Sequence, residues 1–162
     1  MTDHPDHDDP VPDAPPSPSP FVVRAPAATR EPELAALAIA AVVPTLSDLV
    51  AGAQPPVPEH PPVTVTVEEA AGDHGGVMIR VDHAGFGVFA PTDVTAAVAD
   101  GLQQEVVRQF AVTTPVCPGH RHPARVAVVD GMTGWRCPVD PEHWSCPLGG
   151  YPTGDTAGRS AV

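Results

Sequence analysis

The cysteines of this chain constrain its fold more than any other feature. All three lie within thirty residues near the C-terminal end, and a proline follows each of them. Three histidines share the same segment, which reads C-x2-H-x-H-x14-C-x5-H-x2-C. Thiolates and imidazoles together are the ligands that zinc prefers in proteins. The sequence therefore predicts a zinc site whose candidate ligands are Cys117, His120, His122, Cys137, His143 and Cys146.

The spacing of these residues indicates how one ion can reach both halves of the segment. The two-residue gap between Cys117 and His120 allows a tight turn to present both side chains to one ion, and the prolines preset such turns. Between the halves, residues 125–135 read as two short strands joined at Asp130-Gly131, which is a strong hairpin signal. A hairpin would place Cys117 and His120 next to Cys137 and the 143–146 pair.

In this arrangement residues of about 115–148 resemble the zinc-ribbon class of modules. The resemblance implies two knuckles at the ends of a hairpin that hold one zinc ion, although this segment uses at least one histidine and its second knuckle has an unusual spacing. A structural zinc site takes four ligands. We expect them to be Cys117, His120, Cys137 and Cys146. Three alternatives stay open: His122 in place of His120, His143 in place of a later cysteine, and Asp140 as an oxygen ligand.

Proline and glycine limit how much of the chain can fold. Of the 23 prolines, eight lie in residues 1–28 and five in the linker at residues 53–62, whereas the 14 glycines are spread from Gly52 to Gly158. Residues 1–28, rich in Pro and Asp, and residues 151–162 predict disordered tails, because such segments bury too little apolar surface. We expect an α+β domain at 29–112 and the zinc-ribbon-like module at 113–150.

Hydrophobic periodicity predicts the elements of the α+β domain. A first helix should start near Thr29 and break or kink near Val43 because Pro44 follows, and a second short piece should end at Gly52. Strict alternation predicts strands at 63–67 and 77–81, and a third is expected at 86–90. A second helix should follow Asp93 and run to Phe110, with Gly101 in its interior. The expected fold is two helices on a three-stranded antiparallel sheet, followed by the small hairpin module.

Charge and apolar runs restrict location and partners. The net charge is −12, lysine is absent, and residues 111–150 sum to zero, so we expect no nucleic acid as partner. The acidic first residues do not resemble a signal peptide. The longest apolar run, Leu34–Val43, is ten residues, so no membrane span is expected. We expect a cytoplasmic protein, and the Ala-, Val-, Pro- and Arg-rich composition favours a bacterial source.

No motif in the sequence indicates catalysis. The His-Glu-x-x-His, Gly-x-Ser-x-Gly and phosphate-loop patterns are absent. We therefore expect a non-catalytic, zinc-stabilised accessory or protein-interaction protein, with a small zinc hydrolase using Glu142 or Asp140 as base as the alternative. Trp135 and Trp144 should pack over the ribbon, or else form a partner surface. The Ala-rich face of the first helix fits either this chain's own sheet or a second copy in a homodimer.

Overall fold

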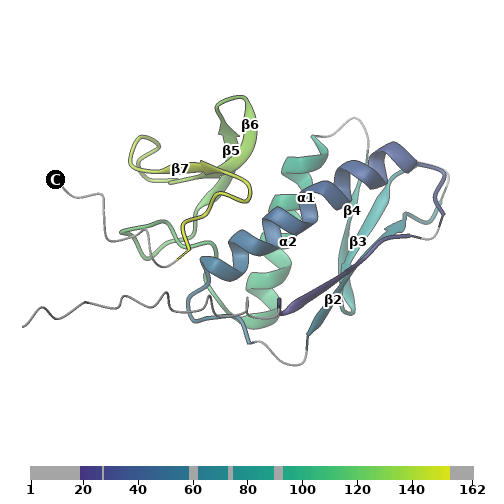
Figure 1. The fold of residues 1–162 in the computed structure, drawn as a ribbon, viewed down its shortest axis with the longest axis horizontal. Helices are drawn as coiled ribbons and strands as arrows, with labels where there is room; N and C mark the ends of the chain where they lie inside the picture. The colour runs from purple at the N-terminus through teal and green to yellow at the C-terminus, as the bar shows by residue number, and fades with distance from the viewer. Residues whose placement is uncertain (1–18, 27, 59–61, 73–74, 90–92, 154–162) are drawn as a thin grey trace, which may run out of the picture.

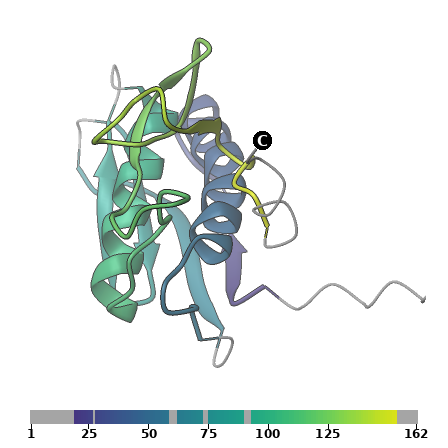
Figure 2. The same ribbon diagram turned by 90° about the vertical axis from the view of Figure 1, so that its left-hand side faces the viewer.

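The structure is a computed structural model that describes residues 19–26, 28–58, 62–72, 75–89 and 93–153. In these residues two helices lie between a four-stranded sheet and a three-stranded sheet (Figure 1). Figure 2 shows the two helices side by side under the smaller sheet. The elements are β1 (Phe21–Arg24), α1 (Pro32–Ala51), β2 (Val63–Glu69), β3 (Val77–Val81), β4 (Ala84–Val88), α2 (Val94–Phe110), β5 (Arg125–Val129), β6 (Met132–Arg136) and β7 (Ser145–Pro147).

The larger sheet has the order β1-β2-β3-β4 and is mixed rather than antiparallel. β2, β3 and β4 form the expected antiparallel meander, in which Val67 of β2 pairs with Ile79 of β3. The alternating valines of β2 are buried against the helices while the threonines between them are partly exposed. The expected three-stranded antiparallel sheet is therefore correct for the meander and incomplete for the sheet, because β1 adds a parallel strand.

Strand β1 lies in a segment that the sequence assigned to a disordered tail. It pairs with β2, with Phe21 opposite Val63, and the Phe21 ring is buried edge-on against the Phe110 ring at 6.1 Å between centroids. The predicted tail at 1–28 therefore extends too far, because β1 gains backbone partners and an apolar contact from residues distant in sequence. Residues 1–18, which include His4 and His7, lie outside the described residues.

Helix α1 continues through Pro44, so the expected break near Val43 is wrong. The helix buries residues on both sides of the proline, among them Ala38 and Leu49, and this burial along one stripe outweighs the cost of an interior proline, about 3 kcal/mol. The Thr45 hydroxyl donates to the Ala41 carbonyl at 2.7 Å in the same turn. The helix begins at Pro32 with Glu31 as N-cap, and Thr29 accepts a hydrogen bond from the Glu31 N–H instead of capping the helix.

The length and hydropathy of helix α1 bear on the expectation that the chain has no membrane span. Over an 18-residue window its mean hydropathy is 2.0, so by length and composition it is able to cross a membrane, and 44% of that window is buried inside the fold. A core helix of a folded domain has the same character. The expectation of no membrane span, which rested on a ten-residue run, therefore stays a prediction.

Helix α2 confirms the expected helix after Asp93. The Asp93 carboxylate accepts from the Ala96 N–H at 3.1 Å, which is the capping arrangement that its position indicated. Gly101 lies where a side chain would meet the ring of Phe86 on β4. The glycine that weakens the helix intrinsically is thus the residue that lets the helix approach the sheet.

The expected hairpin between the two halves of the Cys/His segment is confirmed. β5 and β6 are antiparallel and join at Asp130 and Gly131, whose φ angles of 51° and 78° match a tight hairpin turn. Strand β7, which the sequence did not predict, pairs with β6 so that Trp135 lies opposite Cys146. The hydrophobic core runs continuously from the larger sheet through the helices to Trp135 and Cys146, and the domain boundary expected near residue 112 stays a prediction.

The buried carboxylate of Asp48 joins the smaller sheet to α1. It accepts hydrogen bonds from Trp135 Nε1 at 2.8 Å, from the Gly149 N–H at 2.7 Å and from the Tyr151 N–H at 3.0 Å. Tyr151 also donates its hydroxyl to the Val116 carbonyl at 2.6 Å. The predicted tail at 151–162 therefore starts too early, since Tyr151 is held at both its backbone and its ring; residues 154–162 lie outside the described residues.

Candidate metal site

The first knuckle of the Cys/His segment is a tight turn closed by backbone hydrogen bonds. The His120 N–H donates to the Cys117 carbonyl at 2.9 Å, and the Cys117 N–H donates to the His122 carbonyl at 3.0 Å. Gly119 has a φ of 79°, in the left-handed region where glycine is favoured. The turn therefore brings Cys117, His120 and His122 to one side of the chain.

The second knuckle follows β6 and presents Cys137. The Cys137 N–H donates to the Trp144 carbonyl at 3.0 Å, which closes the loop between these residues. Inside the loop, the Asp140 N–H points at Cys137 Sγ at 3.4 Å. Backbone N–H groups directed at a cysteine sulfur are typical of metal-binding knuckles, because they stabilise the thiolate.

Four side chains from the two knuckles converge on one point. One ligand atom each from Cys117, His120, His122 and Cys137 lies within 4.8 Å of all the others. Cys137 Sγ is 3.5 Å from His120 Nδ1 and 3.9 Å from His122 Nε2, and these two nitrogens are 3.0 Å apart. Both cysteines are buried, whereas both histidines are half-buried. The group can hold a metal ion.

The distances within the group are compatible with a bound metal ion. Metal–sulfur bonds near 2.3 Å and metal–nitrogen bonds near 2.0 Å would place four tetrahedral ligand atoms about 3.3 to 3.8 Å apart. The three distances among Cys137 Sγ, His120 Nδ1 and His122 Nε2 are 3.0 to 3.9 Å, and Cys117 Sγ lies within 4.8 Å of these atoms. The second nitrogen of His122 supports the same reading, since Nδ1 lies 3.2 Å from the Pro123 carbonyl. A carbonyl only accepts, so Nδ1 carries the proton and Nε2 keeps its lone pair toward the group, as in ligating histidines.

Burial makes it unfavourable for Cys117 and Cys137 to be ionised at the same time without a metal ion. Desolvation, together with the neighbouring Cys137, raises the pKa of Cys117 to about 12. Desolvation tends to raise the pKa of Cys137. Hydrogen bonds from the Asp140 and Val139 N–H groups and from the Cys117 thiol lower it by more, so the net shift of this pKa is downward. A divalent cation bound to the group would favour ionisation of the buried Cys117 thiol.

His143 lies beside the group without being one of its four members. Its ring packs against that of His120 at 4.4 Å between centroids. Its Nε2 donates to the Pro118 carbonyl at 2.7 Å, in the first knuckle. His143 therefore connects the second knuckle to the first and packs beside His120.

Cys146, which we expected as the fourth ligand, lies apart from the four-residue group. It is on β7, packed in the hydrophobic core beneath Trp135. Burial and the nearby Asp48 carboxylate raise the pKa of its thiol to about 12. His122, which the sequence offered as a substitute for His120, instead joins the group beside it. Asp140 contributes its backbone N–H to Cys137.

The sequence left open whether the two tryptophans are packed inside the protein or form a partner surface. Trp135 is fully buried and forms no partner surface, and it packs into the core that the smaller sheet shares with α1 rather than over the ribbon alone. Trp144 is half-buried, and its ring meets that of Tyr151 edge-on at 5.6 Å. Sequence reasoning missed Asp48, the partner of Trp135; its one signal was an acidic residue within the apolar stretch of α1.

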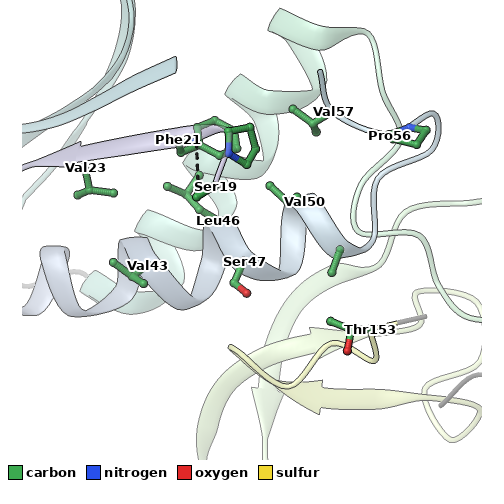
Figure 3. A pocket seen from close by; sticks show the side chains of 12 residues that line it. Ser19, Phe21, Val23, Val43, Leu46, Ser47, Val50, Pro56, Val57 and Thr153 are labelled. Atoms are coloured by element: carbon green, nitrogen blue, oxygen red, sulfur yellow. Dashed lines mark hydrogen bonds between the residues drawn. The ribbon is translucent and has the colours of Figure 1, made fainter. Parts of the chain in front are cut away.

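A groove of about 710 Å³ lies between β1 and α1, away from the Cys/His group. Figure 3 shows Phe21 and Val23 of β1 facing Val43 and Leu46 of α1 across it. Among the described residues, serine and threonine hydroxyls are the polar side chains of its lining, and none of these residues is charged. The described lining therefore contains no acid, base or metal ligand.

The four-residue group is thus the strongest candidate site in the described part of the chain, and its interpretation rests on its own geometry. Comparison of the chain with models of protein families, with curated protein sequences and with solved structures finds no significant match.

Proposed function

We propose that this chain is a small, acidic, zinc-stabilised accessory protein that binds a protein partner and has no catalytic activity of its own. The observation that carries the proposal is the convergence of two buried thiols and two imidazoles, from knuckles separated by a hairpin, within 4.8 Å. Mixed sulfur and nitrogen donors at tetrahedral spacing favour zinc over harder ions. The ion would join the two knuckles, which supply two ligands or more from the first and Cys137 from the second.

The same geometry favours a structural over a catalytic ion. Catalytic zinc sites keep three protein ligands and leave one position for water. Here four potential donors converge within 4.8 Å, and together they would complete a tetrahedral shell without water. A zinc hydrolase remains the alternative, and it requires His120 or His122 to leave the ion so that water can bind. Glu142 or Asp140 would then have to reach that water as the base.

Elemental analysis and cobalt substitution test the proposal together. Purified protein should contain about one zinc ion per chain, and the cobalt form should show the intense visible bands of a four-coordinate tetrahedral centre with two thiolates. Cys137→Ser should lose the ion. A chain that binds no metal would contradict the proposal, and a cobalt centre with bound water would favour the hydrolase.

The partner in this proposal is a protein rather than a nucleic acid. The chain carries a net charge of −12, and the residues around the metal group sum to zero, so the phosphate contacts that dominate nucleic-acid affinity are lacking. We expect no change in fluorescence anisotropy of labelled single- or double-stranded oligonucleotides, even at low salt. Binding that weakens steeply with salt would contradict this part of the proposal. The proposed location is the cytoplasm, where reduced thiols remain available for zinc.

A further inference from the structure

Asp48 is a buried carboxylate whose partners all come from the segment that holds the metal group. The residue is 2% exposed, and the ion pairs of the described residues do not include it. Its three hydrogen-bond donors are Trp135 Nε1 and the backbone N–H groups of Gly149 and Tyr151. A buried carboxylate that loses such donors is strongly destabilised. The smaller sheet can therefore separate from α1 only if these three hydrogen bonds to Asp48 are broken.

Two of these donors lead directly to the two metal-binding knuckles. Trp135 stands on β6 two residues before Cys137, and its indole is fixed between Asp48 and the core. Tyr151 reaches the other knuckle, because its hydroxyl donates to the carbonyl of Val116, the residue before Cys117. One carboxylate on α1 thus holds the backbone that enters each knuckle.

We propose that metal binding by the Cys/His group and docking of the smaller sheet on α1 are coupled through Asp48. The inference rests on the proposed function in that it takes the group to bind zinc. With zinc bound, the two knuckles are joined and Trp135 and Tyr151 stay at Asp48. Without zinc, the knuckles keep only their own turns and the contact of His143 with the Pro118 carbonyl, so the smaller sheet should leave α1 more readily and Trp135 should become more accessible to water. Asp48 is in this sense a positioning residue for the metal site.

Trp135 provides a direct readout of docking. The chain has two tryptophans, so Trp144→Phe leaves Trp135 as the single fluorophore. In the zinc-loaded variant its emission should be that of a buried indole and resist quenching by acrylamide. Removal of zinc with a chelator should shift the emission to longer wavelength and increase quenching several-fold, and added zinc should reverse both changes. Far-UV circular dichroism should show that the helices remain.

Coupling is reciprocal, so a change at Asp48 must alter zinc affinity. Asp48→Ala should weaken zinc binding by about 5- to 150-fold in competition with a chromophoric chelator, the usual range for coupled sites. Asp48→Asn keeps one oxygen as acceptor for Trp135 and should recover part of the affinity. The matched control is Val67→Ala, which removes buried volume from β2, on the far side of the helices from the metal group.

The outcomes separate this inference from the proposed function. If the chain binds no zinc, the proposed function fails. If it binds one zinc ion but Trp135 quenching is the same with and without zinc, only the coupling fails. The coupling also fails if Val67→Ala, at equal loss of stability to urea, lowers zinc affinity as much as Asp48→Ala does, since the effect of Asp48 would then be general destabilisation.

Discussion

Cys137 and Cys146 look alike in the sequence, yet the structure gives them different surroundings. Each follows a tryptophan by two residues and precedes a proline. The pairing of β6 with β7 places Cys146 directly opposite Trp135 on the core side of the small sheet. Cys137 comes just after β6 ends, where the chain turns and directs its sulfur at the histidines. Strand register, rather than the local motif, separates the two residues.

Single substitutions should therefore distinguish the two cysteines. Cys137→Ala should reduce bound zinc from about one ion per chain toward zero, because three ligands remain and one of them is a buried thiol without its partner. Cys146→Ala should keep the full zinc content and lose only packing. Zinc determined by elemental analysis after gel filtration measures both. Loss of zinc from Cys146→Ala would instead support the ligand set expected from the sequence, in which Cys146 is the fourth ligand.

The carboxyl group of Asp48 should make stability depend on pH. Burial raises the pKa of Asp48 above its ordinary 3.8, outweighing the hydrogen bonds from Gly149, Tyr151 and Trp135 that lower it. A raised pKa in the folded state means that the contribution to stability is full below pH 3.8 and is lost as pH rises through the folded pKa. Relative to Asp48→Asn, the wild-type free energy of unfolding should thus fall over this window and then level off.

Urea unfolding of both proteins at a series of pH values, with excess zinc throughout, measures this difference. Protonation of the zinc ligands cancels while both proteins stay saturated with zinc, so the comparison uses the pH values at which each protein holds one ion per chain. A difference that is constant from pH 3.8 to 7, or that grows with pH, would show that the donors around Asp48 stabilise its charged form fully.

At the scale of elements, the sequence predicted what local patterns determine. Alternating valines identified β2 and β3, and Asp93 and Asp130-Gly131 marked a helix start and a hairpin turn. It did not predict β1 or β7, which have four and three residues and exist because of partners elsewhere in the chain. An interruption of α1 was also predicted at Pro44, because the burial that keeps this helix continuous comes from tertiary packing, which local patterns do not report. In the metal site, spacing identified the right segment but not which thiol faces the imidazoles.

The contact between α2 and β4 should make Gly101 intolerant of a side chain. Alanine favours a helix over glycine by about 1 kcal/mol, so Gly101→Ala would stabilise an exposed helix. Here the added methyl group would overlap the Phe86 ring. We expect Gly101→Ala to lower the free energy of unfolding by about 1 to 2 kcal/mol, since overpacking exceeds the gain in propensity.

Urea denaturation followed by circular dichroism checks the sign of this change. Phe86→Leu in the Gly101→Ala background should recover part of the loss, because it removes the ring that the methyl group meets. A stabilised Gly101→Ala protein would mean that β4 and α2 are further apart than the structure places them.

At the scale of the whole molecule, zinc should stabilise the larger sheet as well as the knuckles. The hydrophobic core is continuous from β2 through both helices to Trp135, so with zinc bound the described residues should unfold together. Free zinc at about 100 times its Kd should raise the free energy of unfolding by about 2.7 kcal/mol. Helix content and tryptophan emission should report the same midpoint in zinc, and Cys137→Ala should show no increase.

The parallel pairing of β1 with β2 has a consequence for the order in which the protein assembles. β1 pairs with residues about forty positions later, with α1 between them, whereas β2, β3 and β4 meet through short turns. During synthesis β1 leaves the ribosome first and finds its neighbour late, because high contact order slows such pairings. Until then the apolar residues Phe21, Val22 and Val23 are exposed to other nascent chains. Pro20 and Pro26, which flank them, disfavour intermolecular strand pairing.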